Sequence, residues 1–483
     1  MTPKPPSAQR PLLWGALAFT ALVAMPLPAA VALLVAGIGV RVAVQLAQRA
    51  RAAQAERVAA GDPAATRLGT DPAGRSVSIP DRALAAHGLI LGATGAGKST
   101  TLLTLLGTQI ARGRPVVAID LKGSPTFAQE LAAAAAAAGR PFRLWTIDGS
   151  SYWNPLANGN ATELKDKLIA TERFTEPHYQ RAAERYVQLA LQVMQEAAPE
   201  RPVTLAGIVA MLEPARLAAA TRKLPRERAE SVRAYVSNLT PDQISAVRGL
   251  ASRLAILTES HTGRYLGAPP PGDWPQTVDV RQALESDQVV LFSLNSSSYG
   301  QLAGQLGTLA VQDLVTAAGN RLQSAGARGV PPRQAVVAID EFSALGSDNV
   351  IALLARGREA GVGVLLATQE LADLDRAARG LRDQVLGNTS LKIAHRQDVP
   401  ESATAVARLA GQVKAWDRSY HQQGGALGGR VTRTTTRLVD RDAIDQEQIR
   451  SLRTGEALVI IKSPESSARI TRVVPPDRSA PER

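Results

Sequence analysis

The sequence predicts an α/β protein whose core is a parallel β-sheet, interrupted by an all-helical insertion and preceded by a membrane segment. Short apolar runs recur between helical stretches, which predicts the sheet, and the first of these runs leads directly into a glycine-rich loop and a helix. A stretch of residues without charge near the N-terminus predicts the membrane segment. The chain has 483 residues, which is enough for two or three domains.

The N-terminal segment is long enough to cross a bilayer. Residues 11–40 contain no charged side chain, and about 20 apolar helical residues span the hydrocarbon core. Pro26-Leu27-Pro28 interrupts the stretch, which leaves one kinked span or a hairpin of two short spans open. A cleaved signal peptide is the alternative, although its apolar region is usually shorter. Basic residues on both sides of the stretch predict that the following region lies in the cytoplasm. From the length of the uncharged stretch we expect residues 1–48 to be a membrane anchor.

The composition is basic and lacks cysteine. Lys and Arg number 55 against 43 Asp and Glu, a formal charge of +12, which favours a polyanionic partner, although a GC-rich genome also enriches arginine. With no cysteine, disulfides, thiolate nucleophiles, iron–sulfur clusters and Cys-ligated zinc are excluded. The five histidines are isolated and show no metal-binding spacing.

The remaining chain alternates between predicted strands and helices. After an alanine-rich linker (51–70), apolar runs predict strands at residues 88–91, 114–119, 288–294, 335–339, 362–367 and 457–462. Between about 161 and 267 no run reads as a strand, and Thr240-Pro241-Asp242-Gln243 has the form of a helix capping box. We therefore divide the chain into the anchor, a first part of the sheet domain (49–160), a helical insertion (161–268), a second part (269–474) and a tail (475–483).

The glycine-rich loop predicts a nucleotide site. Residues 92–99 read GATGAGKS and match G-x-x-x-x-G-K-[ST] between a strand and an apolar helix. In such a loop the backbone N–H groups point at the phosphates, Lys98 reaches the β and γ oxygens, and the Ser99 hydroxyl ligates Mg²⁺. The expected nucleotide-binding residues are Gly92, Thr94, Gly95, Ala96, Gly97, Lys98, Ser99 and Thr100. This predicts ATP with Mg²⁺, with a phosphate-binding loop that does not hydrolyse as the alternative.

Polar residues at the ends of later strands complete the predicted site. Asp340 and Glu341 follow an apolar strand, where Asp340 is expected to hold the metal through water and Glu341 to polarise the attacking water. The alternative is that they only cap the next helix. Gln369 ends another strand and is expected to contact water or the γ-phosphate, unless it is merely solvated. Arg358, in preference to Arg356, is a candidate arginine finger toward a neighbouring subunit, or else lines a solvated helix end.

Basic residues gather in two further places. Residues 214–264 carry nine basic side chains against four acidic ones, and Arg430, Arg433 and Arg437 lie in or beside a Gly/Thr-rich stretch (424–436) that we expect to be a mobile loop. Both are candidates for phosphate contacts with nucleic acid, or are solvated faces.

Together these motifs resemble the TraG/TraD-type coupling proteins of conjugative type IV secretion, within the HerA/FtsK superfamily. The resemblance rests on the loop at 89–99, on Ile119-Asp120-Leu121-Lys122-Gly123, on Trp153-Asn154-Pro155-Leu156, and on Asp340-Glu341-Phe342 with Ala367-Thr368-Gln369. It covers about residues 71–474 and extends to the N-terminal anchor. Family members usually have two full membrane spans with an external segment between them. In this sequence only Pro26-Leu27-Pro28 could separate two spans, which is a departure from the family pattern.

The resemblance implies a RecA-like P-loop ATPase, anchored in the bacterial inner membrane as a homohexamer with its motor in the cytoplasm. It also implies that ATP hydrolysis drives the translocation of single-stranded DNA toward secretion-channel components. The DNA would carry a bound relaxase or other nucleoprotein cargo. The helical insertion would receive the cargo. By the same resemblance Lys98, Ser99, Asp340, Glu341, Gln369 and Arg358 take the roles given above. An FtsK/HerA-like motor for duplex DNA, and a receptor that binds ATP and recruits protein substrates without moving DNA, remain the alternatives.

Overall fold

The computed structural model describes residues 64–475, except 173, 175, 271–275, 346, 425–429 and 463–465. The anchor predicted for residues 1–48 lies outside the described residues, as does most of the predicted tail. In the part of the chain that is described, no helix is both long enough and apolar enough to cross a bilayer.

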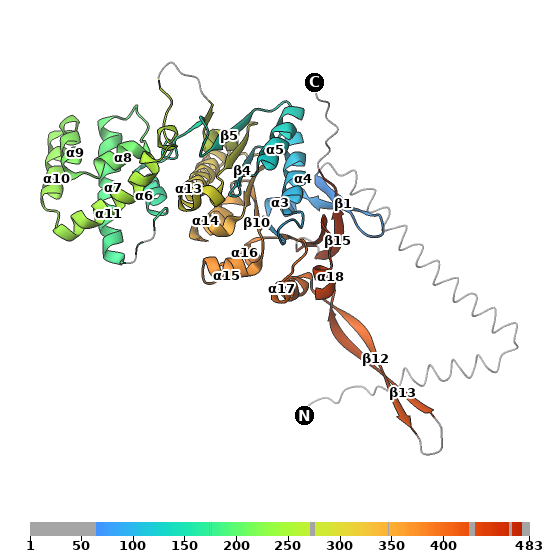
Figure 1. The fold of residues 1–483 in the computed structure, drawn as a ribbon. Helices are drawn as coiled ribbons and strands as arrows, with labels where there is room; N and C mark the ends of the chain where they lie inside the picture. Colours follow the sequence, from blue (N-terminus) through green and yellow to red (C-terminus); the bar gives the residue numbers. More distant parts are fainter. Residues whose placement is uncertain are drawn as a thin grey trace. The chain divides into compact units, whose positions relative to one another are not determined.

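A large mixed sheet forms the core of residues 64–475 (Figure 1). Its order is β2-β1-β15-β14-β11-β3-β10-β9-β4-β8-β5, and all neighbours from β11 to β5 pair in parallel. The other four strands pair antiparallel. The strands are β1 (Ala65–Thr70), β2 (Ser76–Pro80), β3 (Gly88–Leu91), β4 (Val116–Asp120), β5 (Phe142–Thr146), β8 (Val289–Ser293), β9 (Ala335–Asp340), β10 (Val362–Thr368), β11 (Leu391–Ala394), β14 (Glu456–Ile461) and β15 (Ser467–Val473).

Helices cover both faces of this sheet. Because side chains alternate along a strand, Leu89 and Leu91 of β3 enter one apolar core and Ile90 enters the other. The Ile90 core contains side chains of α3 (Asp81–Ala85), α4 (Lys98–Ala111) and α5 (Pro125–Ala137). The Leu89 core contains side chains of α12 (Val280–Glu285), α13 (Ser296–Arg328), η3 (Phe342–Ala344), α14 (Ser347–Gly357), α15 (Leu371–Ala377), α16 (Leu381–Asn388), α17 (Pro400–Ala410) and α18 (Gln446–Arg450). A sheet buried on both faces explains the continuous apolar runs of its central strands.

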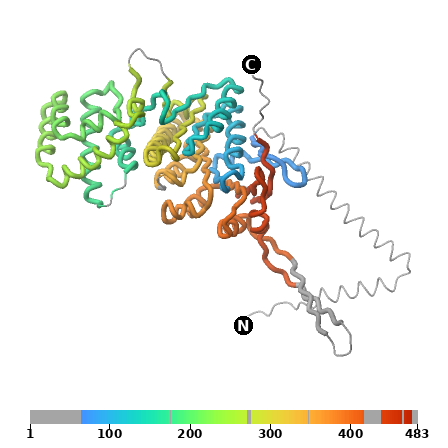
Figure 2. The backbone as a smooth tube through the Cα atoms, viewed as in Figure 1, coloured from blue at the N-terminus to red at the C-terminus, as the bar shows by residue number. Residues whose placement is uncertain are grey.

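A helical segment leaves and rejoins the sheet domain at a small two-stranded sheet of β6 (Tyr152–Trp153) and β7 (Thr277–Val278). It is the green part of the tube in Figure 2 and contains α6 (Ala161–Ile169), α7 (Pro177–Ala197), α8 (Leu205–Met211), α9 (Pro214–Ala220), η1 (Thr221–Lys223), α10 (Arg226–Ser237), α11 (Pro241–Glu259) and η2 (Gly263–Tyr265). The predicted capping box begins α11: the Gln243 backbone N–H donates to the Thr240 hydroxyl, and the Gln243 side chain accepts from the Thr240 N–H.

A buried ion pair joins this segment to the sheet domain. The Lys167 ammonium of α6 lies 2.8 Å from the Asp313 carboxylate of α13, and it also donates to the carbonyls of Pro155 and Asn158. The Trp153 indole N–H donates to the other Asp313 oxygen at 3.2 Å. Two residues of the Trp-Asn-Pro-Leu motif, Trp153 and Pro155, therefore bond to this charged pair where the helical segment begins.

A long two-stranded ribbon replaces the predicted mobile loop. Strands β12 (Gln412–Gly424) and β13 (Arg430–Asp442) pair antiparallel along their whole length, and Figure 1 shows them extending away from the large sheet. The loop predicted over 424–436 was therefore wrong for Gly424, which ends β12, and for residues 430–436, which belong to β13, whereas residues 425–429 lie outside the described residues. Val431 and the threonines that follow it are β-branched and favour a strand, which outweighs the glycine-rich sequence before them.

Candidate nucleotide site

The order of three parallel strands brings the predicted site together. Strand β10 lies between β3 and β9, with Thr368 in register with Leu91 and Ala367 in register with Asp340. Because parallel strands end at the same edge of a sheet, the loop after β3 and the carboxylates after β9 lie on either side of the end of β10. The structure thus places the glycine-rich loop, Gln369 and the acidic pair at one edge.

The glycine-rich loop is built to leave backbone N–H groups free for an anion. Gly95 and Gly97 adopt φ values of 75° and 120°, which side chains rarely allow. A Cβ at Gly97 would lie 3.2 Å from Cε1 of His395 and 3.3 Å from the Gly455 nitrogen. Helix α4 begins at Lys98, and no side chain caps its N-terminus. The first N–H groups of a helix then suit a phosphate, with the helix dipole adding to the attraction.

Lys98 lies inside the loop and is only 4% exposed. Its ammonium donates to the Gly92 carbonyl at 2.5 Å and to the Ala93 carbonyl at 3.4 Å. Burial, together with the nearby Lys122 ammonium, lowers the pKa of Lys98. Backbone carbonyls are the partners of this ammonium here, and phosphate oxygens would offer it stronger, charge-assisted bonds.

The acidic pair is fixed by an unusual backbone. Asp340 is the last residue of β9 and is buried, and burial raises the pKa of its carboxyl group. Glu341 adopts a left-handed conformation with φ 58°, which is costly for a residue with a side chain and is typical of functional sites. Its carboxylate lies 2.7 Å from the Lys122 ammonium and accepts a hydrogen bond from the Gln369 side-chain amide at 3.1 Å.

Gln369 connects the two halves of the site. Its side-chain oxygen accepts from the Thr94 hydroxyl at 3.3 Å, while its amide donates to Glu341. Its backbone carbonyl accepts from the Gly92 N–H at 3.2 Å. Because β10 lies between β3 and β9, a side chain directly after β10 reaches both the loop after β3 and the carboxylates after β9. An amide suits this position because its oxygen accepts from Thr94 while its N–H donates to Glu341.

Arg358 is not part of this arrangement within one subunit. It is exposed just after α14, close enough to His87 to lower the pKa of that imidazole, and His87 lies directly before β3. Arg358 and Arg356 therefore lie near the opposite edge of the sheet, where β3 and β10 begin. Neither side chain contributes to the nucleotide site of its own chain.

The sequence motifs did not assign a role to two residues of the site, Lys122 and His395. Lys122 pairs with Glu341, and it also lies 3.7 Å from Asp340. Burial alone would lower the pKa of Lys122, but the Asp340 and Glu341 carboxylates outweigh it and raise that pKa. Its position two residues beyond the end of a strand, within the quoted motif 119–123, was the available indication.

His395 is the second residue without a role predicted from sequence, and its ring packs against Gly92 and Gly97 of the loop. Its Nδ1 donates to the Glu456 carbonyl at 2.9 Å, which leaves Nε2 to accept from the Thr101 hydroxyl at 2.9 Å. Burial lowers the pKa of His395 to about 4, so the ring is neutral. No local pattern indicated this role, because it depends on β11 lying next to β3.

The donor set of the site fits a magnesium nucleotide. The Ser99 hydroxyl at the start of α4 and the Asp340 carboxylate are oxygen donors, which Mg²⁺ prefers, and Mg²⁺ usually takes one or two protein ligands beside phosphate and water. The left-handed glycines leave room for phosphate against the loop. The residues present therefore fit both groups.

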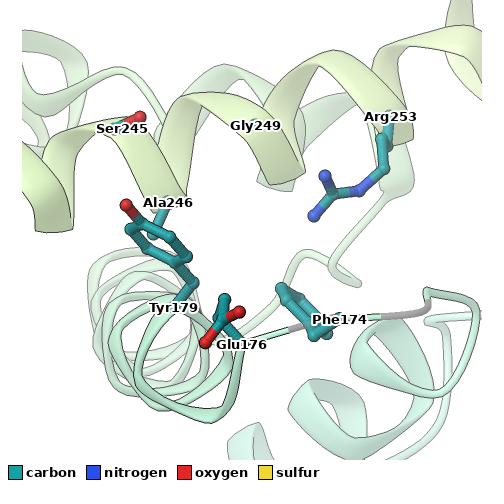
Figure 3. Close-up of a pocket in the computed structure, with 7 residues that line it drawn as sticks. All are labelled: Phe174, Glu176, Tyr179, Ser245, Ala246, Gly249 and Arg253. Carbon is teal, nitrogen blue, oxygen red and sulfur yellow. The ribbon is translucent and has the colours of Figure 1, made fainter.

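A separate pocket lies in the helical segment and is too small for a nucleotide. Figure 3 shows Phe174, Glu176 and Tyr179 facing Arg253 and its neighbours on α11. The pocket has a volume of about 230 Å³, below the range typical of small-molecule sites. The Arg253 guanidinium lies 5.2 Å from the Phe174 ring centre and pairs with Glu172 at 2.8 Å. None of its lining residues belongs to the nucleotide site.

Comparison with known families confirms the resemblance that the motifs predicted. Residues 334–454 match the family model described as the TraM recognition site of TraD and TraG, and residues 45–124 match that of the FtsK/SpoIIIE family. The chain resembles TraG/TraD-type coupling proteins. A search of curated proteins found no relative of matching sequence.

Solved structures share the fold. The bacterial conjugative coupling protein TrwBdeltaN70 in an unbound form is 16% identical, with 87% of this chain and 90% of that chain covered and a TM-score of 0.55. The plasmid coupling protein TrwB in complex with ADP and Mg²⁺ is 16% identical, with 85% and 90% covered and a TM-score of 0.56. VirB4 of Thermoanaerobacter pseudethanolicus is 14% identical, with 86% and 97% covered and a TM-score of 0.54.

Proposed function

We propose that this protein is a P-loop ATPase that moves DNA, with a bound relaxase or other nucleoprotein cargo, toward a conjugative type IV secretion-like channel. One observation carries the ATPase: hydrogen bonds run from Thr94 in the glycine-rich loop through Gln369 to Glu341 after β9. The transfer function is supported by the TraD/TraG family match and by the likeness to a conjugative coupling protein.

Each residue of the site has a role in hydrolysis under this proposal. Lys98 and the N–H groups at the start of α4 would hold the β- and γ-phosphates, the Ser99 hydroxyl would ligate Mg²⁺, and Asp340 would hold the metal through water. When bound, Mg²⁺ acts as a Lewis acid on the phosphoryl oxygens. Glu341 accepts a proton from the attacking water, and Gln369 holds the Glu341 carboxylate in position through the bond they already share. The bond from Thr94 to Gln369 links that position to the loop that carries the phosphates.

Arg358 acts in trans within a homohexamer. Its place near the opposite edge of the sheet makes it unavailable to its own site, which is what a finger supplied to a neighbouring subunit requires. Mixing Arg358→Ala subunits with Lys98→Ala subunits should partly restore hydrolysis, because some sites then combine an intact loop with an intact arginine. No restoration at any mixing ratio would contradict this role.

The other parts of the chain supply location and cargo. Residues 1–48 anchor the protein in the bacterial inner membrane with the ATPase in the cytoplasm. The two parts of the RecA-like motor, 49–160 and 269–474, flank the cargo-receiving insertion 161–268. Within that insertion Arg222, Lys223 and Arg233 are exposed and offer contacts for nucleic-acid phosphates.

The test is ATP turnover with single-stranded DNA, with duplex DNA and without DNA. We expect stimulation by single-stranded DNA that weakens as salt is raised, and loss of turnover under every condition in Lys98→Ala. Stimulation by duplex DNA alone would favour an FtsK-like motor, which the FtsK/SpoIIIE family match makes the second candidate. Normal turnover in Lys98→Ala would refute the nucleotide site.

The third candidate, a receptor that recruits protein substrates without moving DNA, is separated by transfer itself. A Glu341→Gln variant still binds ATP, so a receptor should keep full transfer function while a motor should lose it. Measuring conjugative transfer by this variant therefore decides between an ATP-binding receptor and a translocase.

A further inference from the structure

Lys122 stands on a turn that the surrounding structure holds rigidly. The turn follows β4, and the Asp120 carboxylate accepts the backbone N–H groups of Lys122 at 2.9 Å and Ser124 at 2.6 Å. Gly123 has φ 70°, and a Cβ there would lie 2.6 Å from Cβ of Asn295, so only glycine fits. The backbone of Lys122 is therefore fixed, and only its side chain is able to move.

The Lys122 ammonium shares one carboxylate oxygen with Gln369. It lies 2.7 Å from Oε1 of Glu341, and the Gln369 amide donates to the same atom at 3.1 Å. Lys122 and Gln369 therefore occupy Oε1 of Glu341, while its other oxygen, Oε2, keeps its lone pairs. The side chain of Lys122 is 37% exposed, so it has open space into which to swing.

We propose that Lys122 binds the γ-phosphate of ATP, and that its ion pair with Glu341 belongs to the site without a triphosphate. The inference rests on the proposed ATPase function. The γ-phosphate carries more than one negative charge, and its charge-assisted bonds to the Lys122 ammonium replace the pair with Glu341 at 2.7 Å and the longer contact with Asp340 at 3.7 Å. When Lys122 turns to this phosphate, Glu341 keeps the Gln369 bond but loses its cation, so that Oε1 as well as Oε2 faces the attacking water. ADP has no γ-phosphate, so with ADP the Lys122–Glu341 pair stays closed.

This role differs from that of Lys98, which is buried within the loop and bonded to the Gly92 and Ala93 carbonyls. Lys98 is placed for the β-phosphate, which ADP and ATP share, as well as for the γ-phosphate, whereas Lys122 approaches from the carboxylate side of the site. The two lysines therefore predict different nucleotide preferences: loss of Lys98 should weaken the binding of both ADP and ATP, and loss of Lys122 should weaken only that of the triphosphate.

The experiment measures equilibrium affinities of the full chain for Mg-ADP and for a non-hydrolysable Mg-ATP analogue. In Lys122→Met we expect ADP affinity within about threefold of the unmodified protein and analogue affinity about 10- to 100-fold weaker, as for one lost charged hydrogen bond. Lys122→Arg should recover part of this difference. Lys414→Met, a change at an exposed residue of β12, is the control for removing a lysine elsewhere.

The outcomes separate this inference from the proposed function. Retained ADP binding in Lys122→Met shows that the variant is folded, so an unchanged preference between the two nucleotides would overturn the role of Lys122. If Lys98→Ala also binds both nucleotides normally, the nucleotide site itself is wrong. If Lys98→Ala loses both and Lys122→Met loses neither, only the inference about Lys122 fails.

Discussion

Replacing Lys167 by Met should destabilise the protein strongly, because it isolates a buried carboxylate. The side chains of Lys167 and Asp313 are 1% and 4% exposed, so water does not reach the pair. Removing the ammonium leaves Asp313 with the Trp153 indole as its described donor and takes a donor from the Pro155 and Asn158 carbonyls. Breaking a buried ion pair from one side costs about 3–5 kcal/mol, and we expect an effect in this range.

The double variant Lys167→Met/Asp313→Asn should recover about half of that loss. Asn removes the buried charge and still offers an oxygen to the Trp153 indole. Arg226→Met, on α10, breaks an exposed pair with Glu230 and should cost less than about 0.5 kcal/mol. Urea unfolding followed by tryptophan fluorescence reports the free energies, since Trp153 lies at the pair. A loss below about 1 kcal/mol in Lys167→Met, or a double variant no more stable than the single one, would refute the reasoning.

Three further predictions concern the site and its support. Burial lowers the pKa values of His87 and His395 to about 4, below the value near 6.5 in the unfolded chain. The unfolded chain therefore binds protons more readily, and each histidine makes its full contribution to stability only above about pH 6.5. As the pH falls to 4, each histidine lowers the free energy of unfolding by up to about 3 kcal/mol. Unfolding midpoints measured between pH 7.5 and 4.5 should fall accordingly, and a flat profile would be inconsistent with buried neutral rings. Gly97→Ala should abolish nucleotide binding, because residue 97 has a φ of 120° and a Cβ there would press against His395. The control Gly107→Ala lies on α4, where a Cβ has open space, so this variant should bind nucleotide normally and be up to about 1 kcal/mol more stable. Equal nucleotide binding by the two variants would contradict the loop geometry. Gln369→Ala removes the bond that positions Glu341, so turnover should fall about 100-fold with nucleotide affinity nearly unchanged, which steady-state kinetics and binding measurements distinguish.

Strands that are long and apolar were predictable from sequence. The runs at 335–339 and 362–367 lie within β9 (Ala335–Asp340) and β10 (Val362–Thr368), because strands buried on both faces have continuous apolar side chains. Strand β11 (Leu391–Ala394) was not predicted, since it has four residues and one of them is Lys392. The Lys392 ammonium is buried and donates to the Thr389 carbonyl, and a pattern read from sequence treats such a lysine as exposed.

The limits of prediction at the site have the same origin. Lys98, Asp340 and Gln369 belong to local motifs that a sequence displays directly. Lys122 and His395 contribute only because β4 pairs with β9 and β11 pairs with β3. Strand order is set by packing across the whole sheet, so a local pattern can mark a residue such as Lys122 but does not show which side chains it meets.

ATP hydrolysis and ATP affinity of Glu341→Gln provide the most direct test that the glycine-rich loop and the acidic pair serve one nucleotide. Gln keeps the size of Glu and a hydrogen-bond acceptor but does not take a proton from water. We predict turnover lower by about 100-fold or more, with affinity for Mg-ATP within about threefold. Turnover equal to that of the unmodified protein would show that Glu341 does not act on a nucleotide held by Lys98, and would contradict the account.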